Sequence, residues 1–68
     1  MTTPHGLFTD WLAAEEAWHQ ELRRAFPAER PGDTRYAPKG EGEPGTALRA
    51  RFDAWKTARD RWRKSLPH

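Results

Sequence analysis

The sequence predicts an all-α fold, an antiparallel hairpin of two helices joined by a long Pro/Gly-rich connector, and three observations favour this prediction. Apolar residues recur at steps of three and four, which is the spacing of one helical face. The same apolar pattern occurs twice, with a constant offset of 44 residues. Between the two copies lies a stretch of 18 residues that has no periodicity and is dense in proline and glycine.

The repeated pattern includes all four tryptophans of the 68-residue chain. Two helices with the same side-chain template can pack face to face along one seam. Each buried Phe or Trp removes roughly 150–250 Å² from water, so the paired rings are expected to form the core. The matched pairs are Phe8 and Phe52, Trp11 and Trp55, Ala14 and Ala58, Trp18 and Trp62, and Leu22 and Leu66.

The first helix is predicted to run from about residue 7 to residue 26. Thr3 followed by Pro4 is a plausible start, because a proline in the first turn gives up a donor that has no partner there, and Thr9 is a second candidate cap. Pro27 ends the helix, since its ring disfavours the helical conformation of the residue before it. The apolar side is broad and comprises Leu7, Phe8, Trp11, Leu12, Ala14, Trp18, Leu22, Ala25 and Phe26.

The second helix is predicted to run from about residue 45 to residue 65. It begins near Pro44, Gly45 or Thr46, and Pro67 stops it. Its apolar stripe is narrower than that of the first helix and suits a single seam with one partner helix. The stripe consists of Leu48, Phe52, Trp55, Ala58, Trp62 and Leu66.

The connector, residues 27–44, is predicted to be partly ordered and without regular structure. A loop of this length in a small domain is usually either functional or flexible, and the sequence leaves both options open. Tyr36 is the largest apolar group of the connector. We therefore expect Tyr36 to hold the connector against the helices.

Residues 1–68 are expected to form one small domain. A chain of this length buries only about 60% of the surface that its unfolded form exposes. Very good packing or self-association must therefore compensate for the low stability that so small a core provides. Cysteine is absent, which excludes disulfides and thiolate metal sites and fits a reducing compartment. His5, His19 and His68 are isolated in sequence, so neither a metal site nor a cofactor is expected.

Charge divides along the chain and suggests how the helices align. Residues 1–26 carry a net charge of −2, residues 27–44 carry −1, and residues 45–68 carry +5. An acidic helix facing a basic one favours an antiparallel hairpin or a head-to-tail dimer. Glu15 and Arg59 are 44 residues apart and therefore occupy equivalent positions. They are expected either to form a buried pair that sets the register of the seam, or to extend separately over the indole rings toward water.

Two short motifs resemble chemical sites, and neither is convincing. Residues 40–45 fit the G-x-G-x-x-G pattern of dinucleotide sites, but no strand precedes them and Pro44 lacks an N–H for a phosphate. Glu16 and His19 fit the Glu-x-x-His pattern of di-iron bundles, yet Glu16 points away from the aromatic side. A glycine-rich loop and a solvated helix face are the simpler interpretations.

The favoured function is a non-enzymatic protein-interaction or assembly module that acts through the aromatic helical faces. Two hairpins would form a homodimeric four-helix bundle, or one hairpin would dock on a larger protein. No apolar run is long enough to span a membrane and no signal peptide is apparent, so a cytoplasmic location is expected. The residues expected at the interface or core are Phe8, Trp11, Leu12, Trp18, Leu22, Phe26, Leu48, Phe52, Trp55, Trp62 and Leu66.

The alternative function is nucleic-acid binding through the basic second helix. Basic side chains contact phosphates, aromatic rings can stack on unpaired bases, and the calculated pI of the chain is about 9.5. The basic residues nevertheless surround most of the helix, and two aspartates interrupt them. Residues assigned to this alternative are Arg49, Lys56, Arg63 and Lys64.

Overall fold

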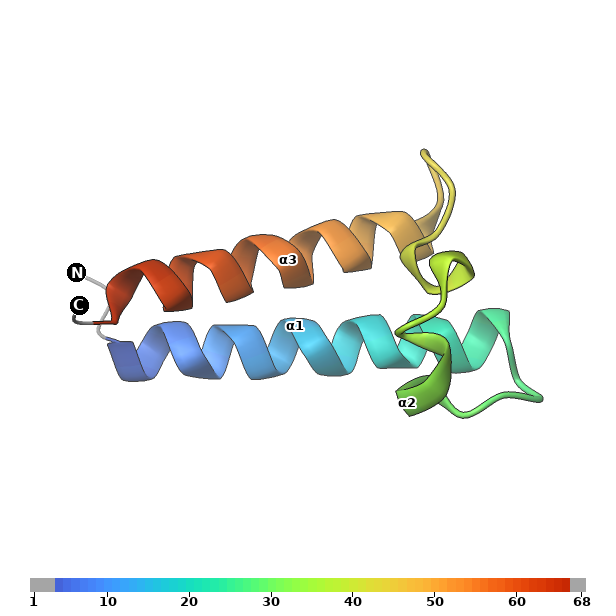
Figure 1. The fold of residues 1–68 in the computed structure, drawn as a ribbon, viewed down its shortest axis with the longest axis horizontal. Helices are drawn as coiled ribbons and strands as arrows, with labels where there is room; N and C mark the ends of the chain where they lie inside the picture. Colours follow the sequence, from blue (N-terminus) through green and yellow to red (C-terminus); the bar gives the residue numbers. More distant parts are fainter. Residues whose placement is uncertain (1–3, 67–68) are drawn as a thin grey trace.

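The computed structural model describes residues 4–66, with side chains from residue 6 onward. Two long helices, α1 (Pro4–Ala25) and α3 (Ala47–Ser65), pack side by side and run antiparallel (Figure 1). The chain between them contains a short helix, α2 (Pro31–Thr34), and a 3-10 helix, η1 (Pro38–Glu41). No strand occurs within residues 4–66. The all-helical class and the packing of two long helices are therefore confirmed, whereas the four-helix bundle stays a prediction.

The ends of the two long helices follow from local chemistry. The Phe26 N–H still donates to the Leu22 carbonyl at 2.8 Å, although α1 ends one residue earlier, before Pro27. Thr46 caps α3, because its Oγ1 accepts a hydrogen bond of 3.1 Å from the backbone N–H of Arg49. The expected cap Thr3 and the expected stop Pro67 lie outside the described residues.

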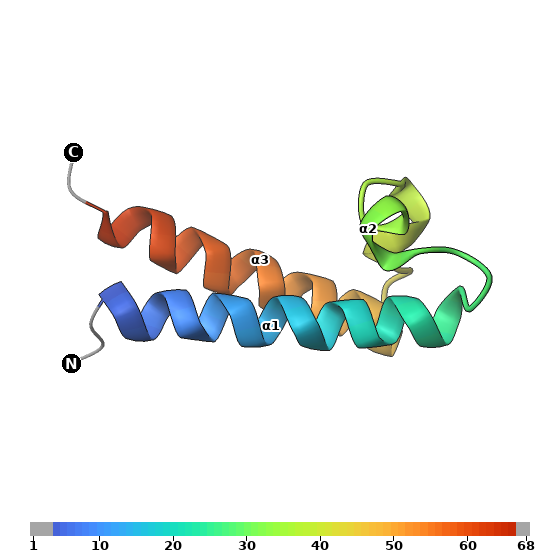
Figure 2. The ribbon, with the colours of Figure 1, turned by 90° about the horizontal axis from the view of Figure 1, so that it is seen from below.

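The buried core lies in the half of the hairpin next to the connector, which we call the closed end. Trp18 and Leu22 are each 1% exposed and Leu48 is 8% exposed. Three partly buried rings, those of Phe26, Phe52 and Trp55, pack around them. The core is small because two helices alone can enclose only one seam, and the connector supplies the remaining cover at this end only (Figure 2).

At the opposite, open end, the aromatic seam continues with less cover. Trp11 of α1 stacks on Trp62 of α3 with ring centroids 4.7 Å apart and planes 25° apart. Phe8 contacts both rings, at 5.9 Å from Trp11 and 5.7 Å from Trp62, and remains 38% exposed. Aromatic pairs therefore join the two helices between Phe8 and Trp18 of α1 and between Phe52 and Trp62 of α3.

The connector is ordered in a different way from the prediction. Tyr36 is 83% exposed, so the prediction that Tyr36 holds the connector is wrong. The connector instead packs closely at small residues: Gly40 lies against Thr34, which is only 2% exposed, and Gly42 lies against the first turn of α3. Pro31 and Pro38, which suggested an irregular segment, lie in the first turns of α2 and η1, where proline is favourable.

Two glycines allow the connector to fold this tightly. A Cβ atom on Gly40 would lie 2.3 Å from the Thr34 carbonyl oxygen. Gly42 has a φ of 81°, and a Cβ atom there would lie 2.6 Å from the backbone nitrogen of Arg49. No other residue fits either position without a backbone shift, so the glycines serve packing and turning.

Gly40→Ala should destabilise the protein by about 1–3 kcal/mol, because the added methyl group overpacks against backbone. Gly32→Ala is the matched control, since a Cβ atom on Gly32 meets nothing within 4 Å. The control should be neutral or slightly stabilising. Urea unfolding followed by far-UV circular dichroism measures both. Equal stabilities of the two variants would contradict the close approach of Gly40 to Thr34.

Candidate interaction site along the aromatic seam

The residues predicted for the interface divide into three groups by burial. The buried group contains Trp18, Leu22 and Leu48. The half-buried group contains Trp11, Phe26, Phe52, Trp55 and Trp62. The exposed group contains Phe8, Leu12 and Leu66, which are 38%, 47% and 40% exposed. Burial therefore decreases from the closed end to the open end of the seam.

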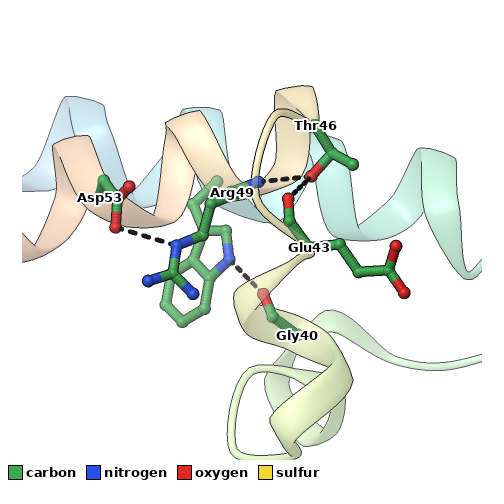
Figure 3. A network of polar contacts seen from close by, with 6 residues as sticks. Gly40, Glu43, Thr46, Arg49 and Asp53 are labelled. Atoms are coloured by element: carbon green, nitrogen blue, oxygen red, sulfur yellow. Dashed lines mark hydrogen bonds and ion pairs between the residues drawn. The ribbon is translucent and has the colours of Figure 1, made fainter.

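Trp18 is the residue that joins the three parts of the chain. Its ring lies 4.7 Å from the Trp55 ring and 5.3 Å from the Phe52 ring, both on α3. Its Nε1–H donates a hydrogen bond of 2.9 Å to the Gly40 carbonyl in η1 (Figure 3). An indole can be fully buried at low cost only when its N–H finds an acceptor, and the connector provides one.

The base of α3 completes the contact with the connector. The Thr46 hydroxyl donates to the Glu43 carbonyl at 2.7 Å while it accepts from the Arg49 N–H (Figure 3). Arg49 Nε lies 3.3 Å from an Asp53 carboxylate oxygen, one turn further along the helix. The glycine-rich residues 40–45 therefore connect η1 to α3, with close packing at Gly40 and Gly42 and open space around Gly45.

Arg35 is a central residue that the sequence pattern did not indicate. Its guanidinium carbon lies 5.1 Å from the Trp18 ring centroid and 5.4 Å from that of Trp55. One of its terminal nitrogens lies 2.8 Å from Glu15 Oε1. An arginine in a Pro/Gly-rich segment belongs to no periodic pattern, so sequence spacing carries no signal for this contact.

Glu15 and Arg59, the expected register pair, each contact a different residue in the structure. Glu15 forms its ion pair with Arg35 of the connector and not with Arg59. Arg59 pairs instead with Asp60 at 3.3 Å, and its guanidinium carbon lies 4.9 Å from the Trp55 ring centroid. This geometry corresponds to the second of the two expected arrangements for Arg59, in which it extends over an indole ring.

The two residues of the Glu-x-x-His motif, Glu16 and His19, make separate contacts in the structure. Glu16 forms an exposed ion pair with Arg23 at 2.9 Å. His19 lies beside Trp18, with ring centroids 5.9 Å apart. Among the described residues no group of three or more His, Cys, Asp or Glu side chains could hold a metal ion.

An apolar groove of about 460 Å³ opens at the closed end, between the end of α1 and the start of α3. Lys39 lies at its edge, 5.0 Å from the Phe26 ring centroid, and is paired with Glu29 at 2.5 Å. The groove therefore offers an apolar floor and few polar anchors for a ligand. It is lined by Ala25, Phe26, Pro38, Lys39, Gly42, Glu43, Thr46 and Leu48.

The basic residues of α3 differ in how strongly they are engaged. Arg49 is paired with Asp53, and the Lys56 ammonium lies 6.0 Å from the Phe52 ring centroid. Arg63 and Lys64 are exposed in the last turn, where positive charge interacts favourably with the helix dipole.

No helix within residues 4–66 is long and apolar enough to cross a membrane.

The surroundings of His19 lower its pKa. Burial lowers the pKa of His19 below its ordinary value of 6.5, and the positive charge of Arg35 lowers it further. Glu15 and Glu16 act in the opposite direction, and Arg23 adds a smaller lowering. His19 Nε2 is buried without a hydrogen-bond partner among the described residues, so a proton there is poorly accommodated.

The lowered pKa of His19 predicts a pH dependence of stability. Between the folded-state pKa and 6.5 the unfolded chain binds more protons than the folded one, so the free energy of unfolding rises with pH. This contribution is complete above 6.5 and is lost as pH falls toward the folded-state pKa. His19→Gln should flatten the profile between about pH 5 and 7.5. Urea unfolding across this range tests it, and parallel profiles for variant and wild type would contradict it.

Comparison with protein-family models, curated proteins and solved structures found no match for this chain.

Proposed function

We propose that this protein is a non-enzymatic assembly module that forms a homodimer through the open end of its aromatic seam. The single observation that carries this proposal is the unequal cover of one flank of α1. Phe8, Leu12, Glu15, His19 and Phe26 follow each other on that flank at steps of three, four and seven residues. The connector covers the flank at Glu15 and beyond, whereas Phe8 and Leu12 are left exposed.

The uncovered surface is apolar and continuous with the seam. Phe8 contacts the stacked Trp11 and Trp62 pair, and Leu66 at the end of α3 is 40% exposed. Contiguous exposed apolar side chains of this kind mark protein interfaces more often than isolated ones do. A partner seated here would extend the cover that the connector gives to the other half of the hairpin (Figure 2).

The surface area of the chain supports a second copy as the partner. The whole chain exposes 5054 Å², whereas a compact monomer of 7.9 kDa exposes about 4,400 Å². The excess approaches the roughly 800 Å² that each partner buries in a stable complex. The molecule measures 39 × 22 × 19 Å, and an elongated shape exposes more surface than a compact one of equal mass. A two-fold dimer would pair the same patch on both copies.

Charge supports an antiparallel arrangement of the two copies. Residues 1–26 carry a net charge of −2 and residues 45–68 carry +5. An antiparallel two-fold pair places the acidic α1 of one copy along the basic α3 of the other, whereas a parallel pair would bring the two α3 helices together. The attraction should weaken with added salt, because exposed charges are screened.

Leu12→Glu should raise the dimer dissociation constant at least about tenfold, because it places a charge in the apolar contact. Ala13→Glu is the matched control: the residue is exposed, and its position lies about 100° further around the helix. Sedimentation equilibrium over a concentration series gives the dissociation constants, and far-UV circular dichroism verifies folding. A wild-type protein that stays monomeric at millimolar concentration, or equal effects of the two variants, would contradict the proposal.

The second candidate function is nucleic-acid binding through α3. It is favoured by the exposed positions of Lys56, Arg63 and Lys64, which enter no ion pair within residues 6–66 of the structure. The aromatic rings of α3 are engaged in the seam, so this function would depend on phosphate contacts alone. Binding would then show no sequence preference and a steep loss with salt. Fluorescence titration with single-stranded and duplex DNA at two salt concentrations distinguishes it from the dimer.

A further inference from the structure

The Arg35 guanidinium lies in an aromatic cage, by which we mean the side chains of Glu15, Trp18 and Trp55. Its central carbon is 5.1 Å and 5.4 Å from the two indole centroids, and Glu15 Oε1 is 2.8 Å from one of its nitrogens. The Arg35 side chain is only 17% exposed. The cation is thus partly removed from water and is compensated by one carboxylate and two ring faces.

The walls of this cage belong to the long helices, and its occupant belongs to the connector. Trp18 and Trp55 are placed by the seam, where their centroids are 4.7 Å apart, and Glu15 lies one helical turn from Trp18. Arg35 directly follows α2 in the chain. The ring centroid of the exposed Tyr36 lies 5.5 Å from the Arg35 guanidinium carbon. The two indoles that form the walls are positioned by the packing of α1 against α3.

A carboxylate beside indole faces is the combination by which proteins recognise organic cations. A guanidinium fits such a site better than an ammonium does. The guanidinium is planar and weakly hydrated, can stack on a ring, and can donate two parallel hydrogen bonds to a carboxylate. We infer that the cage is a guanidinium-binding site, which the chain fills with its own Arg35 and which accepts an arginine-like cation when Arg35 is absent. This site is separate from the proposed dimer surface, since it lies under the connector.

The test is a titration of Arg35→Ala with methylguanidinium. The variant should bind one equivalent with a dissociation constant on the order of 1–10 mM, and its melting temperature should rise with ligand concentration. Wild type should show no saturable binding over the same range. Methylammonium at equal ionic strength should bind about tenfold more weakly, and Glu15→Gln in the Arg35→Ala background should weaken methylguanidinium to a similar extent.

Two further measurements control for occupation of the cage by Arg59 and for unfolding of the Arg35→Ala variant. Arg59 already lies over the Trp55 ring, so Arg35→Ala/Arg59→Gln is titrated as well, in which neither arginine can fill the cage. If Arg35→Ala is unfolded without ligand, methylguanidinium should restore its helical circular dichroism, because a ligand that binds only the folded state shifts the equilibrium toward that state. Absence of saturable binding and of restored helix in both variants, or an equal response to methylammonium, would overturn the inference.

Discussion

The structure depends on the position of one side chain, Trp18. Its ring packs against Trp55 and Phe52 of α3, and its N–H donates to the Gly40 carbonyl of the connector. One residue of α1 therefore fixes both the opposing helix and the segment between the helices. In a chain of 68 residues with 35% apolar content, few other groups bury enough surface to do this.

The connector becomes part of the core through residues that usually signal disorder. Gly40 permits contact with Thr34, and Gly42 permits contact with the first turn of α3. Arg35 then reaches Glu15 and the indole faces, so that a charged side chain covers the aromatic seam where an apolar one would be expected. The uneven distribution of burial along the hairpin follows, because the connector can reach only its closed half, and the open half retains exposed apolar side chains available to a partner.

The sequence predicted the parts of the fold that repeat with helical period. The two long helices and their aromatic faces were predictable, because Phe8, Trp18, Phe52 and Trp62 recur at steps that only a helix brings to one side. The contacts of the connector were not predictable, because Arg35 and Gly40 contact residues that are distant in the sequence, and such contacts leave no periodic pattern along the chain. Tyr36 was misassigned for the same reason: its size suggested that it holds the connector, yet Tyr36 is exposed, and the contacts are made by the Trp18–Gly40 hydrogen bond, the Glu15–Arg35 ion pair and the closely packed glycines. Glu15 found a nearer partner than the equivalent residue of the repeat.

The Trp18 indole is buried between the two long helices and hydrogen-bonded to the connector. Hydrogen exchange of the four indole N–H groups, followed by ¹⁵N NMR, tests this arrangement most directly. The Trp18 N–H should exchange only through global unfolding and should show a nuclear Overhauser effect to the Gly40 α-protons. Exchange of the Trp18 N–H at the rate of a free indole, or contact of its ring with neither α3 nor Gly40, would contradict the account.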